Sequence, residues 1–167
     1  MFSVNHDHES RRAEETCIFL RVGDEKCGIS MAEVQKVTEF NSLNRIPRLP
    51  PALMGISHYH GRVITVLSLA WLLAEDAGGS LEVQPDVLPS PKPGQRLVIL
   101  SRDPRNIALL ADQLLGTGTL QPLEQHSLRR RGLSAGQYRG QVIQKLDVDW
   151  VFEHIASLAE SVSLESG

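Results

Sequence analysis

The chain has 167 residues, a length typical of one domain, and 41% of them are apolar, which is enough for one sizeable core. Seventeen Lys and Arg against 20 Asp and Glu give a net charge of −3, so the basic excess that drives nucleic-acid binding is lacking. No apolar run approaches the roughly 20 residues of a membrane-spanning helix, and the N-terminus lacks the apolar stretch of a secretory signal. We therefore expect a cytoplasmic protein with no nucleic-acid partner and no direct membrane insertion.

The N-terminal part of the chain predicts a β-hairpin. Segments 16–22 and 26–30 are apolar and extended in character, and the turn dipeptide Gly23-Asp24 separates them. Residues 1–15 are polar and mixed in charge, so we expect a flexible tail before the hairpin.

The next segments combine helical and extended signals. Residues 31–34 predict a short helical turn that runs into a strand ending at Phe40. Three prolines exclude a central strand from residues 46–54, where Pro51 is placed to open a short helix that ends at Gly55.

A second hairpin and a long loop follow. β-branched residues recur in segments 55–59 and 62–69, with His60-Gly61 as the turn between them. Residues 75–94 hold four prolines and a Gly-Gly pair, a composition typical of a loop outside the core.

The C-terminal half returns to strand-length runs and closes with a helix. Extended segments are predicted at 96–101, 107–112, 114–121 and 138–146. After Asp147, which is placed as an N-cap, apolar residues recur every three or four positions and predict an amphipathic helix. Its apolar stripe consists of Val148, Val151, Ile155, Leu158 and Val162.

Short strands with one long loop and one terminal helix indicate an all-β fold with a C-terminal helix, built from small barrels. No internal repeat stands out. We expect a single domain over residues 16–160, with the 75–94 loop outside its core and a C-terminal tail at 161–167.

Gly132 to Gly136 match the letters G-x-S-x-G around Ser134. The nucleophile elbow of serine hydrolases needs a strand before the serine and a helix after it. Here a basic triplet precedes Ser134 and an extended segment follows it, so a Gly/Ser loop is the favoured interpretation.

His58 and His60 form an H-x-H pair on a predicted strand, where positions i and i+2 project from one face and can reach one metal ion. The sequence does not bring a third ligand to them from His126, His154 or Asp112. We favour solvent-facing or interface imidazoles, and we expect no metal site, no catalytic residue and no cofactor.

Two further features have ordinary structural interpretations. Arg129, Arg130 and Arg131 are expected on a solvated loop, since no Gly-rich turn leads into a helix that would hold an anion. Cys17 and Cys27 are expected to be buried small apolar side chains in a reducing compartment.

Four segments carry a resemblance to a known family. Residues 22–29, VGDEKCGI, look like a first hairpin of the type LGDEEYGI, and residues 34–37, VQKV, look like a V-x-E-I strand. Residues 46–50, IPRLP, look like I-P-x-x-P, and residues 55–69, GISHYHGRVITVLSL, are similar to G-x-x-N-x-R-G-x-x-x-P-x-x-D-L. In this order the segments resemble the CheW family, the scaffold adaptors of bacterial chemotaxis.

The resemblance implies two intertwined SH3-like five-stranded β-barrels, hence two interleaved subdomains, and no catalysis. It implies a non-enzymatic adaptor of a bacterial chemosensory array, which links the cytoplasmic tip of a chemoreceptor to the regulatory domain of a CheA-type histidine kinase. Carried over by position, the kinase-facing edge includes Val34, Lys36 and Val37, and the receptor-facing groove includes Gly55, His58 and His60.

Several positions depart from the family pattern. Lys36 stands where the family has an acid, His58 where it has asparagine and His60 where it has arginine. The charge has changed sign at the expected kinase edge, and an imidazole replaces a permanently charged guanidinium in the expected groove. The chain is therefore a divergent member, and the alternative function is a CheW-like protein that has lost kinase or receptor coupling and binds another cytosolic partner.

Overall fold

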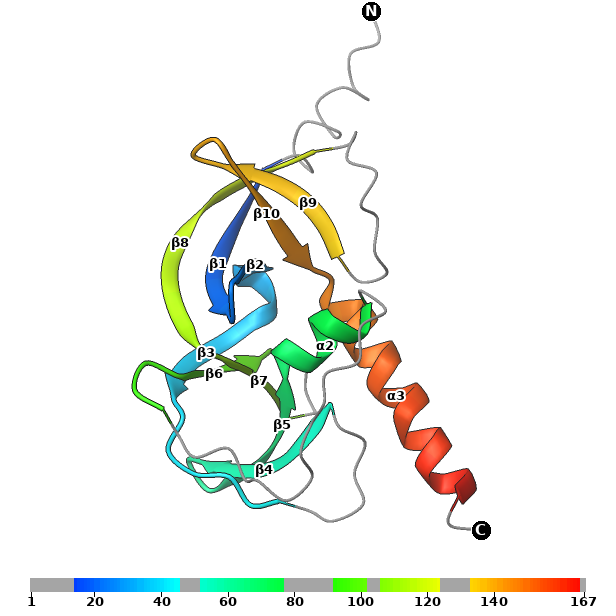
Figure 1. Cartoon of the computed structure of the whole chain (residues 1–167). Coiled ribbons are helices and arrows are strands. Elements are labelled where there is room, and N and C mark those ends of the chain that lie inside the picture. Colours follow the sequence, from blue (N-terminus) through cyan, green and yellow to red (C-terminus); the bar gives the residue numbers. More distant parts are fainter. Residues whose placement is uncertain (1–13, 46–51, 77–91, 102–105, 124–132, 166–167) are drawn as a thin grey trace, which may run out of the picture.

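A computed structural model describes residues 14–45, 52–76, 92–101, 106–123 and 133–165 of the chain. Two five-stranded β-sheets lie end to end, and a long C-terminal helix runs away from their junction (Figure 1). The all-β fold class with a C-terminal helix and two interleaved five-stranded units is confirmed.

The first sheet is a closed barrel, barrel 1, with the strand order β1-β2-β10-β9-β8. Its neighbouring strands are antiparallel except β2 and β10, which run parallel. Barrel 1 therefore takes its strands from both ends of the domain. They are β1 (Glu15–Val22), β2 (Glu25–Ser30), β8 (Gln113–Pro122), β9 (Leu133–Tyr138) and β10 (Gln141–Leu146).

The second sheet, barrel 2, comes from the middle of the sequence and has the strand order β3-β6-β7-β5-β4. Its strands are β3 (Val34–Glu39), β4 (Leu53–Tyr59), β5 (Arg62–Ser68), β6 (Arg96–Leu100) and β7 (Ile107–Ala111). The 3-10 helix η1 (Met31–Glu33) leads from barrel 1 into it. The helices α2 (Leu69–Asp76) and α3 (Val148–Glu165) follow β5 and β10.

Two expectations about local structure are wrong. The short helix before Gly55 is replaced by the start of β4, because Leu53 pairs with Leu67 in the β4–β5 hairpin and continues the ladder. The extended segment expected to begin at Tyr138 begins earlier, since β9 already starts at Leu133 and pairs with β10. The N-terminal tail and most of the 75–94 loop remain predictions, because residues 1–13 and 77–91 lie outside the described residues. The C-terminal tail expected at 161–167 begins later, since α3 continues to Glu165.

The two barrels are built alike. Each has the same order of strand directions, with one parallel pair, β5–β7 or β2–β10, at the corresponding place. Residues 59–73, YHGRVITVLSLAWLL, align without a gap with residues 138–152, YRGQVIQKLDVDWVF. An internal repeat that did not stand out in the sequence is therefore present. Only part of each barrel repeats in the same chain order. In barrel 1 the strands β1 and β2 precede the repeated segment, whereas in barrel 2 the corresponding strands β6 and β7 follow it.

The repeated segment explains both hairpins. His60 and Gly61 have φ of 47° and 74°, and Arg139 and Gly140 have φ of 48° and 76°. A two-residue turn with positive φ at both central positions matches the right-handed twist of its flanking strands. The predicted hairpin at His60-Gly61 is confirmed, and the second one joins β9 to β10.

The helix that follows each hairpin is capped at the corresponding position. Ser68 Oγ accepts a hydrogen bond from the Trp71 amide at 3.1 Å, and Asp147 Oδ1 accepts one from the Asp149 amide at 3.0 Å. A side-chain oxygen at this position satisfies a backbone N–H that has no partner inside the helix. The predicted N-cap at Asp147 is therefore confirmed.

The largest apolar cluster, the shared core, lies between the barrels. On β1, Cys17 and Phe19 pack in a separate cluster in barrel 1, whereas Ile18 and Leu20 belong to the shared core. Neither barrel is complete without the other, because this cluster takes side chains from both barrels and both helices. Its largest fully buried members are Leu20, Ile29, Leu67, Leu69, Leu72, Leu100, Leu109, Leu146, Val98 and Val151.

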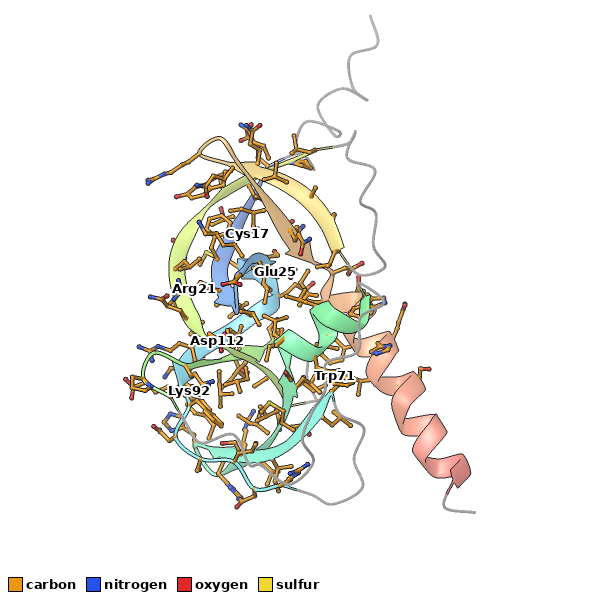
Figure 2. All side chains as sticks on the ribbon, in the orientation of Figure 1. Cys17, Arg21, Glu25, Trp71, Lys92 and Asp112 are labelled. Atoms are coloured by element: carbon orange, nitrogen blue, oxygen red, sulfur yellow. The ribbon has the colours of Figure 1, made fainter. Side chains whose placement is uncertain are left out.

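Asp112 stabilises the connection from β7 of barrel 2 to β8 of barrel 1. Asp112, which follows β7, accepts a hydrogen bond from the Gly23 amide through Oδ2 at 2.6 Å. Its own amide donates to the Arg21 carbonyl at 2.9 Å (Figure 2). The β1–β2 turn and the β7–β8 crossing are thereby held together.

Truncation tests the contribution of α3 to the shared core. Val148, Val151 and Phe152 are buried there, and each buried side chain of this size contributes roughly 1.5–3 kcal/mol. A chain that ends before Asp147 is expected to be insoluble or to lose cooperative thermal unfolding, because this loss approaches the stability of a whole domain. A control chain that ends at Ser157 keeps Ile155, the last described helix residue that packs on the shared core, and should fold. A soluble, cooperatively melting chain without α3 would contradict this assignment.

The two cysteines are buried and free, as expected. Burial raises the pKa of the Cys27 thiol to about 12 and also raises the pKa of Cys17. Because the thiolate is the reactive form, Ellman's reagent at neutral pH should label neither cysteine in the folded protein and both in denaturant. Equal labelling rates in the two conditions would show that the strands open freely.

Candidate functional site

The residues predicted to face a kinase lie on β3, an edge strand of barrel 2. Val34 and Val37 are half-buried and pack on the shared core, whereas Lys36 is exposed. A register shift between Val34 and Lys36 in the pairing with β6 breaks the regular alternation of the strand. Of the three residues, only Lys36 offers an exposed side chain to a partner.

Gly55, predicted in the receptor groove, is buried and serves the closure of barrel 2. Next to Gly55, the backbones of Asn44 and Ile56 form two hydrogen bonds of 2.7 and 2.8 Å with each other. A Cβ on Gly55 would lie 2.3 Å from the Asn44 carbonyl oxygen, and the backbone φ is +149°. A glycine is therefore required here by the close approach of two chain segments.

The two histidines predicted in the groove are both exposed, but they do not lie on one strand. His58 is in β4 opposite Val63, whereas β4 ends at Tyr59 and His60 occupies the turn with φ 47°. The expectation that both imidazoles project from one strand face is wrong, because the left-handed turn reorients the second one.

Tyr59 joins the two predicted surfaces, and the sequence-based prediction did not include it. The Lys36 Nζ lies 5.3 Å from the centre of the Tyr59 ring. The His60 ring meets the same ring edge-on at 4.2 Å and 86°. Arg62 is the cross-strand partner of Tyr59 and is exposed. We call this surface of Lys36, Tyr59, His60 and Arg62 the β3–β4 seam. The recurrence of the tyrosine in the repeat, as Tyr138, was the available signal for it.

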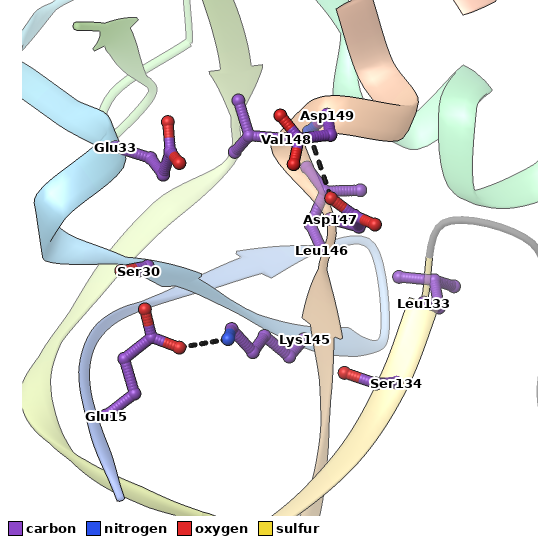
Figure 3. Close-up of a pocket in the computed structure, with 10 residues that line it drawn as sticks. All are labelled: Glu15, Ser30, Glu33, Leu133, Ser134, Lys145, Leu146, Asp147, Val148 and Asp149. Atoms are coloured by element: carbon purple, nitrogen blue, oxygen red, sulfur yellow. Dashed lines mark hydrogen bonds and ion pairs between the residues drawn. The ribbon is translucent and has the colours of Figure 1, made fainter. Parts of the chain in front are cut away.

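A second feature is a cavity of about 390 Å³ where barrel 1, η1 and α3 meet (Figure 3). Within the described residues its lining holds four carboxylates and one amine, and Lys145 forms an ion pair with Glu15 inside it. The lining residues are Glu15, Ser30, Glu33, Leu133, Ser134, Lys145, Leu146, Asp147, Val148 and Asp149.

The ion pair decides the protonation of Glu15. Partial burial raises the pKa of its carboxyl, but hydrogen bonds from Lys145 and Ser30 and the lysine charge outweigh burial and hold the pKa below its ordinary value. Glu15 is thus an anion at neutral pH and fixes the start of β1 against β10.

The interpretation of Ser134 as a nucleophile is not supported. Ser134 lies inside β9 and pairs with Lys145 of β10, so the strand–turn–helix of a nucleophile elbow is absent there. Because β9 continues to Tyr138, the expected Gly/Ser loop is also wrong at this position. His154 stacks on Trp150 of α3 at 4.9 Å and 8°.

The possible metal ligands are scattered. Asp112 is bonded to the Gly23 amide and His154 is stacked on Trp150, while His126 lies outside the described residues. Within the described ranges, no three His, Cys, Asp or Glu side chains are grouped closely enough to hold a metal ion. The Arg129–131 triplet also lies outside these ranges.

The fold defines a module made of two SH3-like barrels, with exposed surfaces and no grouped catalytic or metal-binding side chains among the described residues. Residues 16–156 match the model of the CheW-like domain, and the chain belongs to this family. The scaffolding protein TtCheW from Thermoanaerobacter tengcongensis has a similar structure, with a TM-score of 0.61 at 15% identity over 80% of this chain and 88% of that one. At this identity the likeness concerns the fold. A search of curated proteins finds no match.

Family membership gives a coarse role. The CheW-like domain of this chain and the fold it shares with the scaffolding protein TtCheW support a scaffold role in chemotaxis signalling. Among the helices of the described segments, none is long and apolar enough to cross a membrane.

Replacing Gly55 tests whether it serves barrel closure. Gly55→Ala should lower the free energy of unfolding by more than about 2 kcal/mol, because the new methyl group meets backbone atoms that cannot move aside. Gly28→Ala is the matched control in a buried strand: its Cβ would lie at an ordinary 3.5 Å from the Phe19 ring, and a change within about 1 kcal/mol is expected. Similar losses in both variants, measured by chemical denaturation, would refute the special role of Gly55.

Proposed function

We propose that this protein is a non-enzymatic, cytoplasmic adaptor that links chemoreceptor tips to a CheA-type histidine kinase. The observation that supports the proposal most strongly is the match of residues 16–156 to the CheW-like domain, together with the double-barrel fold. An edge strand with an exposed side chain at Lys36 provides a place where a partner can dock.

Co-purification tests this function directly. The full chain is mixed with the regulatory domain of the CheA-type kinase and with the receptor tip from the same organism, and complexes are separated by size. Binding of both partners is the expected result. Binding of neither, by a protein that is folded by thermal unfolding, would reject the adaptor function.

The charge at the β3–β4 seam favours an altered choice of partner within this function. Lys36 stands where the family pattern has an acid, and His60 stands where the pattern has arginine. Juxtaposed like charges across an interface cost several kcal/mol, so the kinase surface that meets Lys36 should be neutral or acidic. A CheW-like protein that has lost one of its two couplings and binds another cytosolic partner is the second candidate function.

Charge reversal at Lys36 tests the altered partner. We expect weak binding of the native protein to a typical CheA regulatory domain, improved by Lys36→Glu, and weaker binding of Lys36→Glu to the cognate kinase. Titration calorimetry on all four pairings measures this, with Lys26→Glu on barrel 1 as a control of equal charge change. Affinities that agree within about 0.5 kcal/mol across the four pairings would place Lys36 outside the interface.

A further inference from the structure

Barrel 1 has a cavity of about 240 Å³ beside the β9–β10 turn, at the end that points away from barrel 2 (Figure 1). An apolar cavity of about 150 Å³ is large enough for one benzene ring, so this cavity has room for one ring and a small polar group. The mouths of β-barrels are common positions for small-molecule sites. We call the cavity the barrel 1 mouth. Its lining includes Phe19, Lys26, Leu115, Tyr138, Arg139 and Ile143.

The inner wall of the barrel 1 mouth is aromatic and apolar. The ring centres of Phe19 and Tyr138 lie 4.5 Å apart with an angle of 34° between the rings, and Ile143 is buried in the same cluster. A Cβ on Gly118 would overlap the Tyr138 ring, so the glycine leaves the space that this ring occupies. A ligand ring that enters the mouth can therefore pack against two aromatic side chains.

A β-bulge in β8 adds an exposed apolar side chain to the mouth. Phe19 pairs with Gly116, whereas the next residue, Leu20, pairs with Leu114. Leu115 is therefore an extra residue without a partner on β1, and its side chain is 41% exposed. Bulges are common at barrel rims and next to functional sites, where they redirect a side chain. A ligand in the mouth would cover apolar surface of Leu115 that otherwise faces solvent.

Two cations without ion-pair partners also line the mouth. The Lys26 amine donates a hydrogen bond to the neutral Gln141 side chain at 3.1 Å, and the Arg139 guanidinium lies 5.3 Å from the centre of the Tyr138 ring. Among the described residues no carboxylate lies within ion-pair distance of either cation, and none of those that line the mouth is acidic. A bound carboxylate would therefore gain charged donors without displacing an existing acidic partner.

We propose that the barrel 1 mouth is a binding site for a small aromatic carboxylate. The ligand ring packs on Phe19, Tyr138 and Leu115, and its carboxylate accepts hydrogen bonds from Lys26 and Arg139. A ring without charge leaves the cations unused, and an anion without a ring leaves the apolar wall exposed, so the site favours a ligand that has both. The site is independent of the proposed adaptor function, because none of its residues is among those predicted to face the kinase or the receptor.

Titration with benzoate tests the site. Isotope-labelled full-length protein is titrated with benzoate, and amide shifts are followed by NMR. Saturable shifts are expected at residues 115–117 and 138–143. Benzamide, which has the ring without the charge, and acetate, which has the charge without the ring, should each bind at least about fivefold more weakly.

Paired variants test the two cations. Lys26→Gln and Arg139→Asn should each weaken benzoate binding about fivefold, because each removes a charged donor. Asparagine tolerates the positive φ of 48° at position 139. The controls in barrel 2 are Lys36→Gln and His60→Asn, since His60 occupies the corresponding turn position with φ of 47°. Both controls should leave the benzoate affinity unchanged.

A second pair of variants tests the apolar contact. Leu115→Ala should weaken benzoate binding about threefold, whereas Leu114→Ala, at the neighbouring exposed position outside the lining, should not. Thermal unfolding establishes that each variant is folded. The absence of saturable shifts, shifts outside the mouth, equal binding of benzamide or acetate, or equal weakening by the control variants would each overturn the proposal.

Discussion

The shared core between the barrels is the constraint on which the rest of the structure depends. β1 is apolar on both faces because one face packs inside barrel 1 and the other packs against barrel 2. The chain must therefore leave barrel 1 after β2, complete barrel 2 and return through β8 before the core is closed. Both barrels pack on this one core, so loss of α3 or of a buried leucine destabilises both barrels.

The internal repeat shows how one design yields two different surfaces. Tyr59 and Tyr138 end corresponding strands, and each ring has a cation 5.3 Å from its centre. In barrel 1 the cation is Arg139, the next residue of the same turn, whereas in barrel 2 it is Lys36 from another strand. The barrel 2 contact therefore links separate segments into one surface, while the barrel 1 contact remains local.

The described surfaces also differ in charge. The β3–β4 seam presents Lys36 and Arg62, whereas the cavity at the α3 junction is dominated by carboxylates around the Glu15–Lys145 ion pair. A scaffold with regions of opposite charge discriminates between partners by electrostatic complementarity as much as by shape. In the family pattern the position of Lys36 is acidic, so the lysine reverses the charge presented at this exposed position without changing the fold.

Local patterns alone determined much of this protein. Alternation and turn residues predicted most strands, the His60-Gly61 turn and the Asp147 cap, because these depend on short-range backbone geometry. Only the tertiary structure decided the roles of the predicted site residues. The partial burial of Val34 and Val37 and the burial of Gly55 follow from contacts with distant segments. The seam exists because Lys36 of β3 meets Tyr59 at the end of β4. The contact between strands that are far apart in the sequence leaves no pattern within either strand. The contact of Lys36 with Tyr59 could therefore not be predicted from the sequence.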